Sequence, residues 1–225
     1  MIHDIGFTKI EKEVPVVQLL SLIEMCPAWD IPQRGHDRKG NYYDRPTPNV
    51  DWSNYWGVDL TENYHVTQIR KRLDEIAGTL LDDAYFYGSD VSVLAPGSSL
   101  IRPHVDTPHR HPPWNHSPDR RLGIQMSVPL NEWYDGMGGT AFLAHSHRKT
   151  WPIEECYKGT YNEMFKEKSQ TIHLEFGDIA VWDARTLHSQ MINHQTTKRY
   201  VLLLNYVEGD IVDELVAYES SLHDG

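Results

Sequence analysis

Apolar side chains in the first third of the chain recur at the spacing of amphipathic helices. The clearest run is 64–81, where apolar positions follow a period of about 3.6 residues: Val66, Ile69, Leu73, Ile76 and Leu80. Thr61 or Asn63 can cap the start of this helix. A second helical run, 14–25, carries Pro15 near its beginning, where proline is tolerated. The pattern therefore predicts two helices in this part of the chain.

Beyond Gly88 the pattern changes to short apolar runs separated by glycine- and proline-containing turn signals. Eight strands are predicted: Asp90–Ala95, Leu100–Asp106, Gly123–Pro129, Thr140–Ala144, Gln170–Glu175, Asp178–Asp183, Leu187–Ile192 and Arg199–Val207. This arrangement is typical of a double-stranded β-helix, the cupin-like jelly-roll barrel. We expect a mainly β fold with flanking α-helices in a single domain, 1–225. It would comprise a helical part (1–88), a jelly-roll core (about 89–207) and a short acidic tail (208–225).

Length and charge narrow the partners of this domain. A chain of 225 residues can bury one substantial core. Its formal net charge of −11 at pH 7 argues against nucleic acid as a partner. No apolar run approaches the roughly 18 residues of a membrane span, and the N-terminus lacks the pattern of a secretion signal. We therefore expect a cytoplasmic protein without membrane contact; the sequence leaves its oligomeric state open.

Candidate metal ligands occur in two segments far apart in the sequence. His104 and Asp106 flank Val105, and His188 lies well downstream. Residues i and i+2 of a strand face the same side, so His104 and Asp106 would project into one cavity. Two imidazoles and one carboxylate make a facial triad with open coordination positions, which is diagnostic of non-haem Fe(II) oxygenases. His104, Asp106 and His188 are therefore the predicted metal ligands and catalytic residues.

A candidate anion-binding group accompanies this triad. Arg199 begins the strand that follows His188, so both side chains can face the same interior across a hairpin. A buried arginine needs an anionic partner, and a guanidinium binds a carboxylate bidentately. A dicarboxylate such as 2-oxoglutarate can chelate iron with its keto-acid end and reach Arg199 with the other. Gln125, Ser127 and Thr140 are inward-facing polar candidates for co-substrate binding.

From about Val91 to Tyr206 the sequence resembles the Fe(II)/2-oxoglutarate-dependent oxygenases, and among them most closely the phytanoyl-CoA hydroxylase-like group. The segment His104-Val105-Asp106 is similar to the H-x-D box of that group. The glycine-rich segment 138–148 is similar to its G-x-L-x-x-x-P-G-S-H segment, and Phe176-Gly177-Asp178 also matches before a strand. The other matches are a distal histidine, an asparagine five residues on and a 2-oxoglutarate arginine eleven residues on: His188, Asn193 and Arg199.

The chain departs from the group at two places. Gln190 stands two residues after the distal histidine, where the group usually has serine, and Ala144-His145 replaces the proline that the group has before Gly-Ser-His. The segment 121–130 is also loosely similar to the aspartyl and prolyl hydroxylases of the same superfamily. The sequence therefore indicates the superfamily more clearly than the branch.

The resemblance implies Fe(2+), 2-oxoglutarate and O2 as the reacting set, with Arg199 anchoring 2-oxoglutarate. It also implies hydroxylation of a small molecule or an amino-acid side chain, with release of succinate and CO2. Two alternatives stay open. One is an oxygenase acting on a peptide or protein side chain; the other is a non-catalytic metal-binding cupin barrel, which would have no use for Arg199.

The loop 107–121 is the candidate lid, because it starts one residue after a predicted iron ligand. Its histidines and arginines make it basic in an otherwise acidic protein, which favours an anionic small-molecule substrate. Arg110, Arg120, Trp114 and Trp182 are the candidate substrate contacts. The aromatic segment 42–56 would either pack over the barrel mouth or form part of the substrate entrance.

Overall fold

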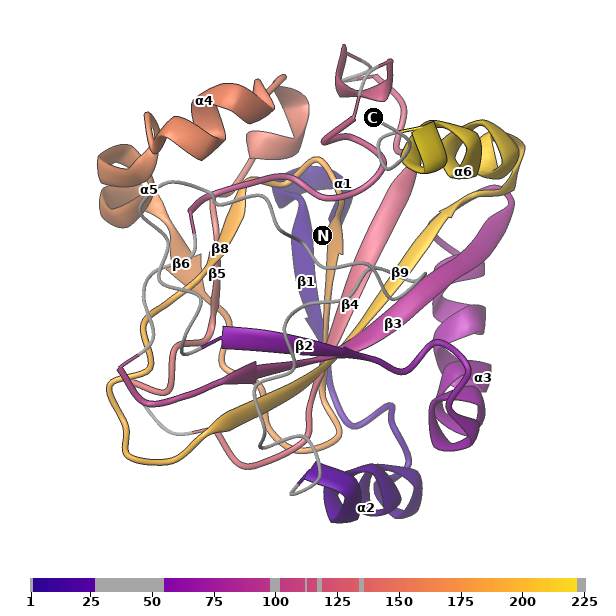
Figure 1. Cartoon of the computed structure of the whole chain (residues 1–225), viewed down its shortest axis with the longest axis vertical. Coiled ribbons are helices and arrows are strands. Elements are labelled where there is room, and N and C mark those ends of the chain that lie inside the picture. Colours follow the sequence, from indigo (N-terminus) through magenta and orange to yellow (C-terminus); the bar gives the residue numbers. More distant parts are fainter. Residues whose placement is uncertain are drawn as a thin grey trace.

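The computed structural model describes residues 2–26, 55–97, 102–111, 113–116, 119–133 and 136–221. Its largest element is a six-stranded antiparallel sheet in the order β1-β7-β4-β9-β3-β2 (Figure 1). In that order the strands are β1 (Phe7–Ile10), β7 (Ile179–Asp183), β4 (Gly123–Pro129), β9 (Arg199–Glu208), β3 (Ala84–Leu94) and β2 (Tyr55–Asp59). A second, three-stranded sheet contains β6 (Gln170–Thr171), β5 (Thr140–Phe142) and β8 (His188–Gln190). Two antiparallel sheets are what the strand pattern predicts for a jelly roll.

One face of the six-stranded sheet is covered by two helices, α2 (Val16–Met25) and α3 (Tyr64–Gly78). Ile124, Met126 and Val128 of β4 belong to the core on this outer face and are fully buried. The Asn63 side chain caps α3 by accepting hydrogen bonds from the backbone N–H groups of the second and third residues after it. The apolar side chains of α3, which recur every 3.6 residues, and those of β4, which recur every two residues, thus pack together in one apolar layer.

The other face of the large sheet meets the three-stranded sheet. Phe7 of β1 stacks on Phe142 of β5 with ring centroids 4.8 Å apart, and Trp182 of β7 lies 5.3 Å from Phe142. Because alternate residues of a strand face opposite sides, Gln125 and Ser127 of β4 lie on this inner face. The space between the two sheets is therefore lined by both aromatic and polar side chains.

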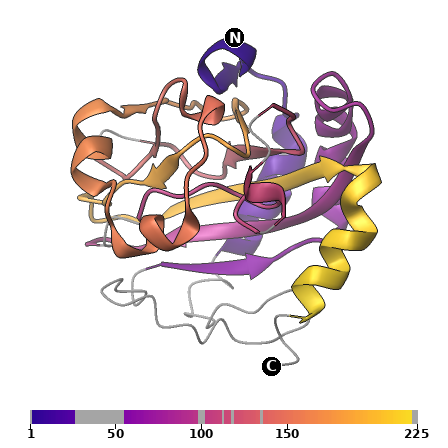
Figure 2. The same cartoon turned by 90° about the horizontal axis from the view of Figure 1, so that it is seen from above.

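Smaller elements flank the two sheets (Figure 2). α4 (Ile153–Lys158) and α5 (Asn162–Lys168) contribute to an apolar cluster with residues of the three-stranded sheet. α6 (Val212–Ser221) packs with the ends of β3 and β9. The short elements are α1 (Ile2–Ile5) and the 3-10 turns η3 (Trp114–His116), η4 (Ser146–Arg148) and η5 (Gly209–Ile211). None of the helices among the described residues is long and apolar enough to cross a membrane.

Several elements differ from the sequence-based expectation. The part predicted as helical contains the edge strands β1 and β2, which are only four and five residues long and show too little alternation to be recognised. The predicted acidic tail contains η5 and α6. Of the predicted strand Leu100–Asp106, the described part forms only an isolated bridge at His104. Most of the aromatic segment 42–56, and Leu100 itself, lie outside the described residues.

Candidate active site

Backbone pairing brings the three predicted metal ligands together. His104 and His188 exchange two backbone hydrogen bonds, with N–O distances of 2.9 and 3.0 Å, and the Asp106 N–H donates to the Ala184 carbonyl at 2.8 Å. One ligand atom from each side chain then lies within 4.8 Å of the other two. The Nε2 atom of His188 is 3.3 Å from Oδ2 of Asp106, and that of His104 is 3.9 Å from Oδ1. This spacing suits a single metal ion.

Both imidazoles are oriented by backbone carbonyl groups. Nδ1 of His104 pairs with the Arg102 carbonyl oxygen at 2.8 Å, and Nδ1 of His188 pairs with that of Thr186 at 3.0 Å. When Nδ1–H donates, Nε2 carries the lone pair that binds a metal. Burial, together with the nearby His188, lowers the pKa of His104 to about 4. Its imidazole is therefore neutral near pH 7, which is the protonation state that coordinates a metal.

The carboxylate of the triad is held from the large sheet. The indole Nε1–H of Trp182 donates to Oδ2 of Asp106 at 2.9 Å. The same indole lies 5.3 Å, between ring centroids, from the imidazole of His188. Trp182, a predicted substrate contact, thus touches two of the three metal ligands.

Arg199 lies buried at the start of β9, with 1% of its surface exposed. Its guanidinium carbon is 4.7 Å from the centroid of the Trp133 ring, and Nη1 donates to the Gly138 carbonyl. The same carbonyl accepts a hydrogen bond from Nε2 of Gln190 at 3.2 Å. Gln190 is two residues after His188 on β8, so the two side chains share a face about 7 Å apart. Arg199 is thus linked to the triad through the Gly138 carbonyl and Gln190, which is two residues from His188 on β8.

Gly138 is required at this junction because its φ is +79° and a Cβ atom would collide with the Met191 carbonyl oxygen. Asn193 shapes the neighbouring turn, since its side-chain amide donates to the carbonyls of Leu94 and Thr197 at 3.0 and 2.9 Å. The asparagine that follows the distal histidine therefore supports the turn between β8 and β9.

A row of polar groups lies on the inner face of the large sheet. Gln125 pairs in register with Trp182 on one side and Asn205 on the other. Thr140 is buried on β5 of the three-stranded sheet, which faces this row. Among the described residues, the buried side-chain atoms without a hydrogen-bond partner include three on neighbouring strands of this inner face, namely Oγ of Ser92, Oγ of Ser127 and Oδ1 of Asn205. Buried polar groups normally have partners, so this row is suited to a polar ligand.

Ser92 and Asn205 were not identified from the sequence. Asn205 could have been noticed because it is the one amide in an otherwise apolar alternating row of β9, beside Val201, Leu203 and Val207. Recognising it required the register of β9 against β4, which the sequence does not give.

The loop after Asp106 is bound to the C-terminal elements. Arg120 forms an ion pair with Asp210 at 2.9 Å, and the Nη2 atom of Arg110 lies 4.0 Å from Oε1 of Glu219. Trp114 is buried in the cluster beneath α6. The positive charge of Arg110 and Arg120 is thus partly balanced within the protein.

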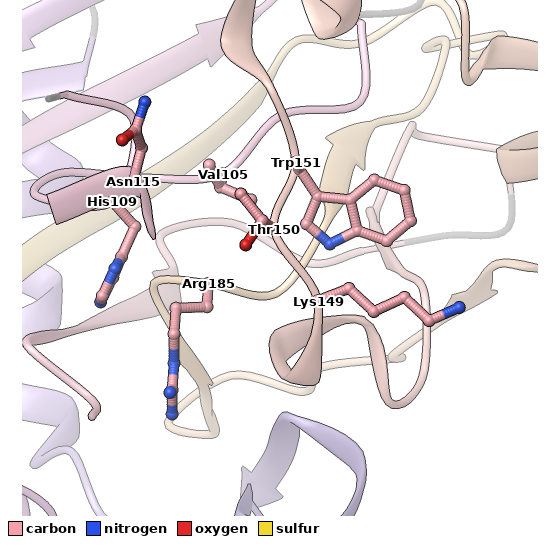
Figure 3. Close-up of a pocket in the computed structure, with 7 residues that line it drawn as sticks. All are labelled: Val105, His109, Asn115, Lys149, Thr150, Trp151 and Arg185. Carbon is pink, nitrogen blue, oxygen red and sulfur yellow. The ribbon is translucent and has the colours of Figure 1, made fainter. Parts of the chain in front are cut away.

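A small pocket lies behind the ligand segment (Figure 3). It is lined by Val105, His109, Asn115, Lys149, Thr150, Trp151 and Arg185. None of the three predicted metal ligands lines this pocket, and Val105 belongs to the apolar cluster that contains residues of α4 and α5. The side chains of Lys149 and Arg185 extend in different directions, so their charged ends do not converge on one point.

Neither protein-family models nor curated proteins match this sequence. Solved structures match its fold. HygX from Streptomyces hygroscopicus, solved with nickel, 2-oxoglutarate and hygromycin B, has a TM-score of 0.68 and 11% identity over 92% of this chain and 85% of its own. EvdO2 from Micromonospora carbonacea var. aurantiaca has a TM-score of 0.66 and 18% identity over 92% and 88%.

SnoN, described as a non-haem α-ketoglutarate-dependent epimerase from nogalamycin biosynthesis, has a TM-score of 0.66 and 17% identity over 92% of this chain and 78% of its own. These likenesses confirm the predicted double-stranded β-helix fold with flanking helices. Within the described residues the two sheets are not joined into a closed barrel.

Proposed function

We propose that this protein is an Fe(II)- and 2-oxoglutarate-dependent oxygenase that hydroxylates a small molecule. The observation that carries the proposal is the convergence of His104, Asp106 and His188, with both Nε2 atoms turned toward one carboxylate. Two imidazoles and one carboxylate fit ferrous iron and leave coordination positions for other ligands. When bound, iron with 2-oxoglutarate and O2 supplies the oxidising power to attack an unactivated C–H bond, with release of succinate and CO2.

The residues around the triad support 2-oxoglutarate as the co-substrate. Arg199 is a buried guanidinium, which binds a carboxylate bidentately, and the Trp133 ring and the Gly138 carbonyl fix its position. Gln125, Ser127 and Thr140 would bind the remaining oxygen atoms from the inner face. HygX and one structure of EvdO2 were solved with 2-oxoglutarate, and both have this fold.

Hydroxylation is the reaction outcome that we infer. Asp106 would hold the metal at the position that, as the family resemblance implies, halogenating relatives leave to chloride, so halogenation is not expected. Among the structural neighbours are an epimerase and a carbocyclase, and analysis of the product will separate these outcomes from hydroxylation. Within the superfamily, the H-x-D box and the spacing of His188, Asn193 and Arg199 favour the phytanoyl-CoA hydroxylase-like group.

Small molecules are the favoured substrate class. HygX and SnoN were solved with hygromycin B and nogalamycin RO, respectively. We retain Arg110, Arg120 and Trp114 as candidate substrate contacts, acting when the loop 107–121 moves away from its ion pairs. An anionic substrate and a cytoplasmic location remain our expectations from the charge pattern and the sequence.

The test is an anaerobic titration of the Fe(II)-loaded protein with 2-oxoglutarate, followed by a succinate-release screen. We expect a visible absorption band that saturates at one equivalent of 2-oxoglutarate, and succinate release that rises with one class of small molecule. A peptide library forms the second arm of the screen. If only peptides increase succinate release, the substrate is a protein side chain and not a small molecule. Metal binding without any 2-oxoglutarate binding would instead indicate a non-catalytic cupin barrel.

A further inference from the structure

We propose that Trp182 is a positioning residue that fixes the Asp106 carboxylate in its metal-binding orientation. The inference rests on the proposed metal site and deepens it. Asp106 lies in a loop rather than in one of the two sheets, and its backbone N–H is bonded to Ala184. Its carboxylate can therefore rotate about the side-chain bonds unless something holds it. The Nε1–H of Trp182 donates to Oδ2 at 2.9 Å and provides that restraint.

The indole is itself immobilised by the fold. Trp182 is 3% exposed and sits on β7 between Phe7 of β1 and Gln125 of β4 in register. Its ring centroid is 5.3 Å from those of both Phe142 and His188. An indole packed on several sides has its two side-chain torsions fixed, so the N–H direction is set by the core before any metal binds. Trp182 thereby couples the loop ligand to the strand ligand.

The hydrogen bond has a chemical consequence at the metal. A carboxylate can bind a cation through one oxygen or through both. If both oxygens bind, Asp106 takes a coordination position that a co-substrate needs. A neutral N–H donor on Oδ2 limits this freedom without adding charge to the site. Residues that orient a metal ligand in this way typically change metal affinity by about 10–100-fold when they are altered.

The experiment is a titration of the apo-protein with Co(II) alone, for wild type, Trp182→Phe and Trp151→Phe. Trp182→Phe keeps a ring in the core and removes the N–H. Trp151→Phe makes the same chemical change, because the indole of Trp151 also donates one hydrogen bond, to the Ser146 carbonyl at 2.8 Å. Trp151 lies in the cluster that contains α4 residues, so this variant controls for the loss of one indole hydrogen bond.

We expect Trp182→Phe to weaken Co(II) binding about 10- to 100-fold and Trp151→Phe to change it less than about twofold, while both variants keep wild-type circular dichroism. Equal Co(II) affinity in Trp182→Phe and wild type overturns the inference but leaves the metal site standing. Equal losses in the two variants overturn it as well. If wild type binds no Co(II), the proposed function and the inference fall together.

A measurement on the wild-type protein covers the case in which Trp182→Phe does not fold. Co(II) is paramagnetic, so an indole N–H bonded to a metal-binding carboxylate must show a large shift or broadening in the proton NMR spectrum. Of the seven tryptophans, we expect the Trp182 indole proton to respond first to stoichiometric Co(II). The response should be absent in Asp106→Ala. A spectrum in which no indole proton responds would overturn the inference.

Discussion

Neighbouring residues on β4 meet two different environments although they are equally buried. Met126 and Ser127 both have 0% exposure. Met126 faces the apolar layer under α2 and α3, whereas Ser127 faces the inner side, where its hydroxyl has no hydrogen-bond partner among the described residues. Burial alone therefore does not distinguish a stabilising position from a functional one. The outer face is optimised for apolar packing, and the inner face gives up part of this stability to keep polar atoms available for a ligand.

The largest expected effect comes from removing a ligand on the inner side. His188→Ala deletes one of three protein donors, so we expect metal binding to be abolished while the outer core keeps the protein folded. Metal content after dialysis, measured together with circular dichroism, checks both parts. Full metal occupancy in this variant would show that the triad is misassigned.

A matched pair on β4 tests the comparison directly. Met126→Ala removes a fully buried side chain from a packed core and should lower the free energy of unfolding by about 2–5 kcal/mol. Ser127→Ala deletes a buried hydroxyl that has no hydrogen-bond partner among the described residues, so the free energy of unfolding should change by less than about 1 kcal/mol. Urea denaturation of the two variants measures the difference, with 2-oxoglutarate affinity as the second readout. A Ser127→Ala variant that is as destabilised as Met126→Ala would place Ser127 in the structural core.

Arg199 is the inner-face residue with the strongest expected effect on co-substrate binding. Arg199→Lys keeps one positive charge but loses the planar pair of donors, so 2-oxoglutarate affinity should fall about 10- to 100-fold while metal affinity stays near wild type. Calorimetric titration of the metal-loaded variant checks this. Unchanged 2-oxoglutarate affinity would assign Arg199 a purely structural role, between Trp133 and Gly138.

The next prediction concerns His109, in the loop that follows Asp106. Burial lowers the pKa of His109 from 6.5 to about 4, and both ring nitrogens are engaged, with the Trp114 carbonyl and the Leu122 N–H. A pKa below its unfolded value means that stability is fully present above pH 6.5 and is lost as the pH falls toward 4. When the pH falls from 7.5 to 5, His109 should lower the free energy of unfolding by about 2 kcal/mol.

His109→Gln removes the titrating ring and keeps one donor and one acceptor. The difference between the free energies of unfolding at pH 7.5 and pH 5 should therefore shrink by about 2 kcal/mol relative to wild type. Other groups titrate equally in both proteins, so the comparison isolates His109. An unchanged pH dependence would mean that the pKa of His109 is the same in the folded and the unfolded protein.

The parts of this molecule that could be predicted share a local signal. The strand 123–129 was predicted with its observed bounds because its apolar run begins with glycine and ends with proline. Two of the three triad residues, His104 and Asp106, were found because an H-x-D spacing places both side chains on one side of an extended chain. Such features depend on residues that are near one another in sequence.

The parts that were missed depend on contacts between distant segments. Phe7–Ile10 is a strand because it pairs with the edge of β7. A segment of four residues does not by itself indicate this pairing. The hydrogen bond from Trp182 to Asp106 joins positions 76 residues apart. The basic loop suggested a lid, whereas the acidic partners of Arg110 and Arg120 lie in the C-terminal segment, which the sequence indicated only as a tail.

The smallest expected effect is at the exposed Arg120–Asp210 pair. Both side chains are about half exposed, at 49% and 55%, so water screens their attraction. Arg120→Gln should lower the free energy of unfolding by less than about 1 kcal/mol, and Asp210→Asn should do the same. The double variant should lose no more stability than the less stable single variant, because both changes remove the same ion pair.

If Arg120 also binds the substrate, Arg120→Gln will raise the succinate released per substrate consumed, and Asp210→Asn will not, because it leaves the guanidinium in place. Identical coupling in both variants would restrict Arg120 to holding the loop against the C-terminal elements.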